Sequence, residues 1–214
     1  MQWIYLHGLA SGPDSTKGRA FQSYFKERGI SLHLPDLNTP DFYSMTVSTQ
    51  MELVTSLFRP GPKTLFGSSL GGLVTLLLAE KHDDIERIIL LAPAIGFLNR
   101  YAQELGAQAL HDWKTTGRRS IFHYGKNQEM DWSSAILDDL QLHPARMERQ
   151  IPCLIFHGLE DDVVPFQDSV AYLSANTAAR LLLFHSDHQL TNALPLMLEE
   201  SFRFIQEPLD FLIP

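Results

Sequence analysis

Short apolar runs alternate along the chain with longer segments whose apolar positions follow a helical spacing. This alternation is typical of a parallel sheet with helices on both faces. The apolar runs predict six parallel strands, at residues 3–7, 31–35, 63–67, 85–92, 153–157 and 180–185. The segments between them predict helices at residues 15–28, 46–58, 70–82, 166–174 and 193–206. The pattern therefore predicts an α/β fold.

One interval interrupts the alternation. The stretch from Pro93 to Pro152 is about twice as long as a simple crossover needs. It contains six aromatic residues, namely Phe97, Tyr101, Trp113, Phe122, Tyr124 and Trp132. Exposed segments rarely carry so many aromatic residues unless they cover something apolar. We therefore expect residues 94–150 to form a lid above the carboxyl edge of the sheet, where ligands bind in such folds. The alternative is a set of ordinary surface helices that lengthen the domain.

Length and composition favour a single soluble domain carrying this insertion. The chain has 214 residues, of which 44% are hydrophobic and 20% are charged. It contains no repeat and no low-complexity linker, so residues 1–214 are expected to form one compact unit. The formal net charge is -8, and no basic cluster is larger than Arg118-Arg119. Nucleic acid is therefore not an expected partner, because phosphate binding requires a surplus of Lys and Arg.

The sequence shows no signal for a membrane or for secretion. The longest uncharged apolar run, residues 88–98, is too short to span a bilayer and contains Pro93 and Gly96. The first residues enter a predicted core strand at once, so we expect a cytoplasmic location. The only cysteine, Cys153, lies in an apolar strand and is expected to be a buried, inert thiol.

Chemistry is indicated first by the pentapeptide G-S-S-L-G at residues 67–71, which lies between a predicted strand and a predicted helix. A serine on such a tight turn is forced outward, and small residues two positions before and after it let the backbones approach. The pattern predicts a nucleophile elbow at Ser69. The alternative is a serine that only caps the helix, since serine is a preferred N-cap residue.

A serine hydroxyl is a poor nucleophile unless a histidine accepts its proton and a carboxylate orients that histidine. Two segments after predicted strands carry such groups. Residues 157–165 read H-G-L-E-D-D-V-V-P, and residues 185–190 read H-S-D-H-Q-L. These segments make Asp161 and His188 the candidate acid and base for Ser69. His185 competes with His188, but it is predicted to end a core strand.

The motifs H-G-L, G-x-S-x-G, H-G-x-x-D-x-x-V-P and D-H, in this order along the chain, resemble those of the α/β-hydrolases over nearly the whole chain. Within that family the chain resembles small bacterial YqiA-type esterases and the palmitoyl-protein thioesterase group. The resemblance implies that Asp161 is the acid and that its neighbours Glu160 and Asp162 face solvent. His7 and His157, beside their glycines, are expected to have structural roles.

The same resemblance implies an oxyanion hole made by the backbone N–H groups of Leu9 and Leu70. The residues just beyond Leu9 either line the mouth of the pocket or form a plain helix N-terminus; they are Ser11, Asp14, Ser15 and Lys17. The chain begins at the strand that carries the oxyanion loop, without the two strands that usually precede it. We therefore expect a shortened α/β-hydrolase sheet of about six strands with a small lid insertion.

No cofactor and no catalytic metal are expected. The remaining histidines show no pair at metal-ligand spacing with a third ligand; they are His33, His82, His111, His123 and His143.

The motifs and the resemblance together imply a serine hydrolase that cleaves a carboxylic ester or thioester of a small or lipid-like acyl group through an acyl-enzyme. The expected partner is that small molecule, without nucleic acid or stable membrane insertion. The sequence carries no signal for an oligomeric state. The alternative is a non-catalytic protein of the same fold that binds a small apolar ligand under the lid.

Overall fold

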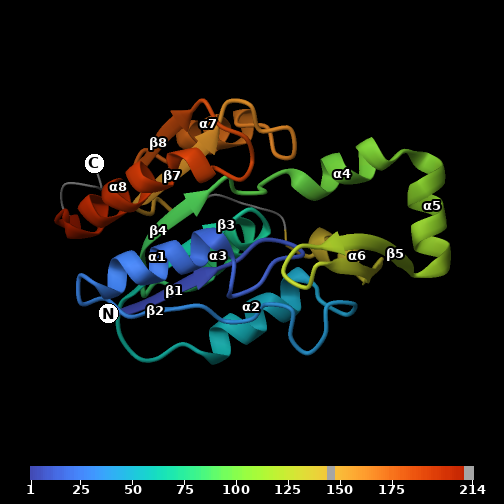
Figure 1. Ribbon diagram of the computed structural model, residues 1–214, viewed down its shortest axis with the longest axis horizontal. Helices are drawn as coiled ribbons and strands as arrows, with labels where there is room; N and C mark the ends of the chain where they lie inside the picture. Colours follow the sequence, from blue (N-terminus) through green and yellow to red (C-terminus); the bar gives the residue numbers. More distant parts are fainter. Residues whose placement is uncertain (144–147, 210–214) are drawn as a thin grey trace.

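A six-stranded parallel sheet forms the centre of the computed structural model, which describes residues 1–143 and 148–209 (Figure 1). The strand order is β2-β1-β3-β4-β7-β8, and every neighbouring pair is parallel. The strands are β1 (Gln2–Leu6), β2 (Leu32–His33), β3 (Lys63–Ser68), β4 (Ile85–Leu91), β7 (Cys153–Gly158) and β8 (Ala179–Phe184). The predicted α/β class and the six parallel strands are confirmed.

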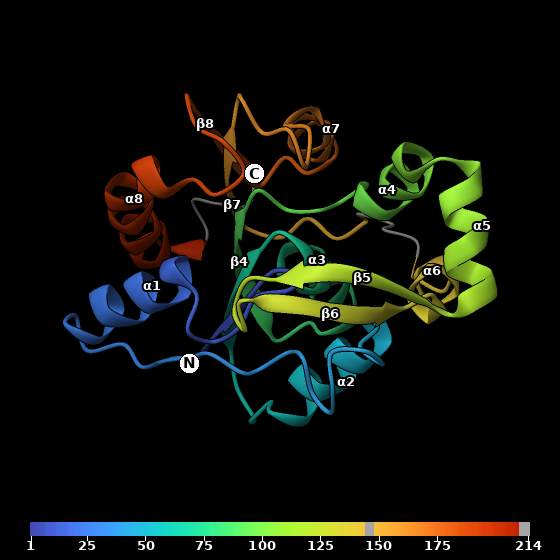
Figure 2. The same cartoon turned by 45° about the vertical axis from the view of Figure 1, so that its right-hand side comes forward.

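Helices cover both faces of this sheet. The helices are α1 (Thr16–Lys26), α2 (Val47–Ser56), α3 (Leu70–Lys81), α7 (Gln167–Ala175) and α8 (Leu194–Gln206), with a short 3-10 turn, η1 (Thr191–Ala193), before α8. Helices α1 and α8 pack together on one face, whereas α2, α3 and α7 share the hydrophobic cluster of the other face (Figure 2). The five predicted helices are all present, and no end differs from the prediction by more than two residues.

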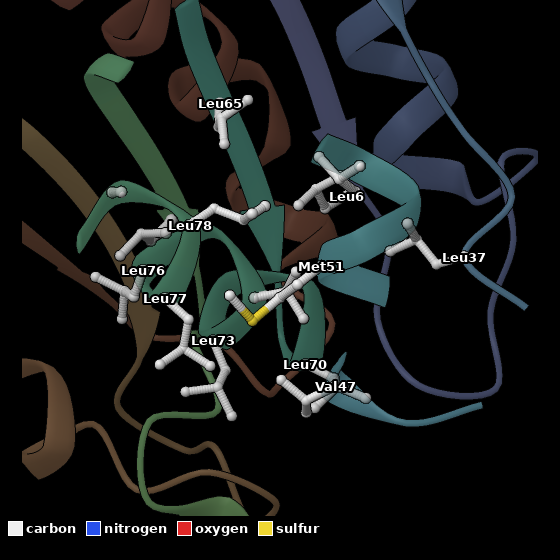
Figure 3. Close-up of a cluster of buried hydrophobic side chains, with 14 of the residues drawn as sticks. Leu6, Leu37, Val47, Met51, Leu65, Leu70, Leu73, Leu76, Leu77 and Leu78 are labelled. Atoms are coloured by element: carbon white, nitrogen blue, oxygen red, sulfur yellow. The ribbon is translucent and has the colours of Figure 1, made fainter. Parts of the chain in front are cut away.

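The alternation of side chains along each strand divides the core into two clusters. Ile4 and Leu6 of β1 point into the cluster with α2 and α3, whereas Tyr5 between them points into the cluster with α1 and α8. Helix α3 is buried from Leu70 to Ala79, which explains why its sequence is apolar on all sides. Figure 3 shows leucine side chains of α3 around Met51 of α2, and Leu65 of β3 belongs to the same cluster.

The edge strand β2 is much shorter than predicted. A strand was expected over residues 31–35, but only Leu32–His33 pair with β1. Pro35 has no backbone N–H to donate to a ladder, and an edge strand has a neighbour on one side only. The chain therefore leaves the sheet before the proline.

The insertion of residues 94–150 connects β4 to β7 and lies beyond the carboxyl end of β4 (Figure 1). It contains α4 (Phe97–Leu105), α5 (Ala107–Thr116), the antiparallel hairpin of β5 (Arg118–His123) and β6 (Gln128–Ser133), and α6 (Ala135–Gln141). Residues 144–147 of the predicted insertion lie outside the described residues. The hairpin was not predicted, because its strands mix charged and apolar residues without a continuous apolar run.

Part of the aromatic content of the insertion packs against the body of the protein. Trp113 and Trp132 are buried in the cluster shared with α2 and α3, and the Trp113 indole donates a 3.0 Å hydrogen bond to the Trp132 carbonyl. Phe122 and Tyr124, at the end of the hairpin, are 41% and 74% exposed. The two tryptophans are therefore part of the core, whereas this pair is exposed at the end of the hairpin.

Polar contacts also tie the insertion to the sheet and its helices. Arg100 of α4 forms a 2.6 Å ion pair with Asp168 of α7. Arg149, at the end of the insertion, donates to the carbonyl oxygens of four residues around the turn from α3 to β4, namely Ala79, His82, Asp83 and Ile85. Both ends of the insertion are thus fixed to elements of the central fold.

Two further features bear on the sequence predictions. Among the described helices, none combines the length and apolarity needed to cross a membrane. Cys153 is buried in β7 as expected, and burial raises the pKa of its thiol.

Candidate active site

Ser69 occupies a strained turn between β3 and α3. Its φ and ψ are 54° and −119°, a conformation that L-residues with a side chain rarely adopt. The turn is held by the Ser69 N–H, which donates to the Leu91 carbonyl at 2.9 Å, and by the Ser69 carbonyl, which accepts from Gly72 at 2.8 Å. The hydroxyl makes no capping hydrogen bond to α3. The interpretation of Ser69 as a simple helix cap therefore does not fit.

The glycines on either side of Ser69 are required by close backbone approaches. A Cβ atom on Gly67 would collide with the Gly71 carbonyl oxygen, and one on Gly71 would collide with the carbonyl oxygens of Leu6 and His7. The G-x-S-x-G spacing therefore lets α3 start directly against β1 and β3, and this packing fixes the position of Ser69.

The structure brings Ser69, His188 and Asp161 together, although they are far apart in the sequence. His188, in the loop after β8, has its Nε2 atom 3.1 Å from the Ser69 Oγ. Its Nδ1 atom lies 2.8 Å from Oδ2 of Asp161, which follows β7. The imidazole is 13% exposed and the carboxylate is fully buried. Parallel neighbouring strands place these loops at one edge of the sheet, next to the elbow.

Asp161 accepts hydrogen bonds through both oxygens. Its Oδ1 accepts from the backbone N–H groups of Val163 and Val164, at 2.9 Å and 2.7 Å. Its Oδ2 faces His188 and also His157, whose Nε2 atom is 3.2 Å away. Burial alone would raise the pKa of Asp161, but the hydrogen bonds from His157, His188 and Val164 lower it well below its ordinary value. The carboxylate is therefore ionised at neutral pH.

The loop that carries His188 is held in place by Asp187, within the loop itself, and by Lys17 of α1. The Asp187 carboxylate accepts from the backbone N–H groups of Gln189 and Leu190, at 3.0 Å and 3.3 Å. The Lys17 ammonium lies 3.5 Å from the His188 carbonyl oxygen. Burial lowers the pKa of Lys17 to about 8, against the opposing effect of the carboxylates of Asp161 and Asp187. These contacts fix the backbone from which the imidazole projects.

The neighbouring residues that could replace His188 as the base or Asp161 as the acid are exposed to solvent. His185 is 88% exposed and faces Glu160, which is also exposed. Asp162 is exposed as well, next to the buried Asp161 carboxylate. None of these three side chains has a hydrogen bond to Ser69 or His188 among the described residues.

The two predicted oxyanion donors have N–H groups that no hydrogen bond uses within the described part of the chain. Leu70 is the first residue of α3, and Leu9 follows β1. A Cβ atom on Gly8 would lie 3.1 Å from the Ser69 Cβ, so the Gly8–Leu9 peptide lies directly beside the serine.

His7 orients this peptide. The Leu37 N–H donates to His7 Nε2 at 3.0 Å, so the ring proton is on Nδ1, which lies 2.9 Å from the Gly8 carbonyl oxygen. The carbonyl and N–H of a trans peptide point in opposite directions. The bond from His7 to the Gly8 carbonyl therefore also fixes the direction of the Leu9 N–H.

The residues after the oxyanion loop were predicted either to line the mouth of the pocket or to form a plain helix N-terminus, and their contacts differ. Ser15 is the N-cap of α1 and accepts from the Gly18 N–H at 3.3 Å, while Asp14 forms an exposed pair with Arg19. Lys17 instead points to the His188 loop. Ser11 offers its carbonyl oxygen to the Asn38 amide at 2.8 Å. Within residues 1–143 and 148–209, no group of three or more His, Cys, Asp or Glu residues could hold a metal ion.

Comparison with protein families gives a match over nearly the whole chain. Residues 2–202 match the family model of UPF0227, described as an uncharacterised protein family. The chain belongs to the UPF0227 family. This assignment confirms the resemblance to YqiA-type proteins. No curated protein matches this UPF0227 member.

Solved structures resemble this UPF0227 protein closely in fold. A putative hydrolase from Agrobacterium vitis S4 has a TM-score of 0.82 and 22% identity, covering 96% of this chain and 88% of that chain. Est1E from Butyrivibrio proteoclasticus, with ferulic acid bound, has a TM-score of 0.77 and 20% identity, covering 95% and 87%. A monoacylglycerol lipase from Paleococcus ferrophilus has a TM-score of 0.73 and 17% identity, covering 95% and 94%. The expected α/β-hydrolase fold is thereby confirmed.

Proposed function

We propose that this UPF0227 protein is a serine hydrolase that cleaves a carboxylic ester or thioester of a small or lipid-like acyl group. One observation carries the proposal: the His188 Nε2 atom lies 3.1 Å from the hydroxyl of Ser69, and the strained elbow leaves this hydroxyl free of any capping bond. A nucleophile, a base and an orienting acid in hydrogen-bond contact are the arrangement that acyl transfer needs.

In the proposed mechanism the Ser69 oxygen attacks the acyl carbonyl while its proton passes to His188 Nε2. Asp161, ionised and buried, stabilises the imidazolium through its 2.8 Å contact with Nδ1. The N–H groups of Leu9 and Leu70 bind the negative charge on the carbonyl oxygen. The imidazolium then protonates the leaving alcohol or thiol, and an acyl-Ser69 ester remains.

The second half of the reaction repeats these roles with water. His188 takes a proton from a water molecule that attacks the acyl-Ser69 carbonyl. The tetrahedral intermediate collapses, the proton returns to Ser69, and the carboxylic acid leaves. The name of one structural neighbour, a monoacylglycerol lipase, supports hydrolysis of an ester.

We further propose that the insertion of residues 94–150 acts as a lid that supplies an apolar wall for the acyl group. Several side chains pack partly buried against the main cluster, including Leu9 in the oxyanion loop, Ile95 just after β4, and Ile121 and Met130, which face each other in the hairpin. The hairpin end reaches the same loop, because the Gly125 N–H donates to the Ala10 carbonyl at 3.3 Å. Half-buried apolar side chains of this kind suit an acyl chain.

Steady-state hydrolysis of p-nitrophenyl acetate tests the proposal. Ser69→Ala and His188→Ala are expected to lower turnover by roughly 10⁴-fold or more, and Asp161→Asn by a similar order, because the three groups act as a unit. Each variant should keep the circular dichroism and melting temperature of a folded protein.

Asp162→Asn is the matched control, since Asp162 is the exposed neighbour of the proposed acid. It should retain turnover. Damage by Asp162→Asn and not by Asp161→Asn would show that the acid is wrongly assigned. A folded wild type that binds apolar ligands but hydrolyses no ester or thioester would favour the non-catalytic alternative.

A further inference from the structure

A second imidazole shares the carboxylate that orients His188. His157, on β7, is completely buried, and its Nε2 atom lies 3.2 Å from Asp161 Oδ2 and 2.8 Å from the Val164 carbonyl oxygen. The Asp161 carboxylate and the Val164 carbonyl can only accept hydrogen bonds. The Nε2 atom of His157 must therefore carry a hydrogen, which it donates to the Val164 carbonyl at 2.8 Å. The same N–H edge of the ring lies 3.2 Å from the carboxylate oxygen that faces His188.

The other side of the His157 ring is fixed by Ser169. The Ser169 Oγ atom, on α7, lies 2.7 Å from His157 Nδ1 and is completely buried. When the ring is neutral, the hydroxyl donates to Nδ1 and holds the tautomer with hydrogen on Nε2. Ser169, His157, Asp161, His188 and Ser69 thus form one continuous line of side chains from α7 to the elbow, with 3.2 Å or less between the polar atoms of each neighbouring pair.

We propose that His157, supported by Ser169, is a positioning residue that holds the Asp161 carboxylate in place and limits how strongly it attracts a proton on His188. This inference rests on the proposed hydrolase function. It gives a role in the reaction to His157, for which the sequence predicted only a structural role beside Gly158.

The physical consequence concerns the pH range of activity. A polar N–H group close to an ionised carboxylate stabilises the ionised form, and the His157 N–H also holds Val164, whose own N–H donates to Asp161 Oδ1. Removing the His157 imidazole therefore makes Asp161 more basic. A more basic carboxylate stabilises the His188 imidazolium more strongly. His188 would then keep its proton up to a higher pH, and a protonated His188 cannot accept the proton of Ser69. The other charged groups facing this pair, Lys17 of α1 and Asp187 in the His188 loop, are unchanged.

The test is the pH profile of kcat/KM for p-nitrophenyl acetate, whose acid limb reports the base of the free enzyme. His157→Leu is expected to lower the maximum about tenfold and to move the midpoint of the acid limb up by about half a pH unit or more. His157→Gln places an amide N–H near the former Nε2. It should restore most of the maximum kcat/KM and return the midpoint of the acid limb most of the way to the wild-type value. Ser169→Ala should cause a smaller shift in the same direction.

Ser201→Ala is the matched control for Ser169→Ala. Ser201 is also a completely buried helical serine, but its hydroxyl has no partner among the described residues. This variant should match the wild type in profile and activity.

A lower maximum with an unmoved midpoint in both His157→Leu and Ser169→Ala would overturn the proposal, because a purely structural role reduces the active fraction equally at every pH. If His157→Leu does not fold, Ser169→Ala decides by the same criterion. A wild type that hydrolyses the ester while these variants keep its midpoint refutes this inference alone. A wild type without hydrolysis refutes the proposed function and this inference with it.

Discussion

At the residue scale, the proposed chemistry depends on the contacts around Ser69, such as the 3.1 Å between its Oγ and His188 Nε2. The sequence predicted Ser69, Asp161 and His188 because the elbow and the two strand-end motifs carry recognisable spacing. It did not predict the bond from His7 to the Gly8 carbonyl or the approach of Gly8 to Ser69. Such contacts depend on how the loop after β1 folds over α3, which local patterns do not encode.

Gly8→Ala is expected to lower kcat by roughly 100-fold, the loss typical of one misplaced oxyanion donor. Its Cβ would lie 3.1 Å from the Ser69 Cβ and 3.4 Å from the Ser68 carbonyl oxygen, so the loop must move away from the serine. Steady-state kinetics with a short-chain ester measures the change.

Gly12→Ala, in the same loop, is the control for this substitution. A Cβ atom on Gly12 has nothing within 4 Å, so kcat should remain at the wild-type value. Equal losses in both variants would indicate that the loop tolerates no added side chain for general reasons, and would contradict the specific role of the Gly8–Leu9 peptide.

At the element scale, the strands that the sequence predicted well are those that are most deeply buried in the structure. The strands β3, β4 and β7 are buried on both faces, so their apolar runs stood out. The hairpin of β5 and β6 has one face toward the protein and one toward solvent, and its inward face mixes the polar Arg119 and His123 with the apolar Ile121, Met130 and Trp132. A strand whose inward face mixes polar and apolar residues lacks a clean alternation and cannot be distinguished from a loop by its sequence pattern.

The hairpin yields a prediction about acyl-chain length. Ile121 faces inward and is half-buried, so Ile121→Trp should fill the space proposed for the acyl chain. We expect kcat/KM for p-nitrophenyl octanoate to fall about tenfold relative to the acetate ester.

Phe122 is the neighbouring control, because its side chain is on the opposite face of the same strand and is exposed. Phe122→Trp should leave the ratio of octanoate to acetate hydrolysis unchanged. A ratio unaffected by Ile121→Trp would contradict the placement of the acyl chain beneath the hairpin.

At the scale of the whole molecule, the parallel order β2-β1-β3-β4-β7-β8 brings three loops from distant parts of the sequence to one edge. The order of the motifs in the sequence predicted that these loops meet at this edge. It did not predict how the insertion is fixed to the central fold. That fixing depends on pairs such as Arg100 with Asp168 and on Arg149 at the α3–β4 turn, which come from tertiary packing. The line from Ser169 through His157 to Asp161 has the same origin, since it joins α7 to β7 across the core.

Reaction with a fluorophosphonate, followed by intact mass and peptide mapping, tests the central claim most directly. A serine activated by His188 should form one covalent adduct per chain, and mapping should place it on Ser69. Ser68→Ala, which changes the buried neighbour in the same turn, should still be labelled, whereas Ser69→Ala should not. A folded wild type that forms no adduct, or one that carries it on another residue, would contradict the assignment of Ser69 as the nucleophile.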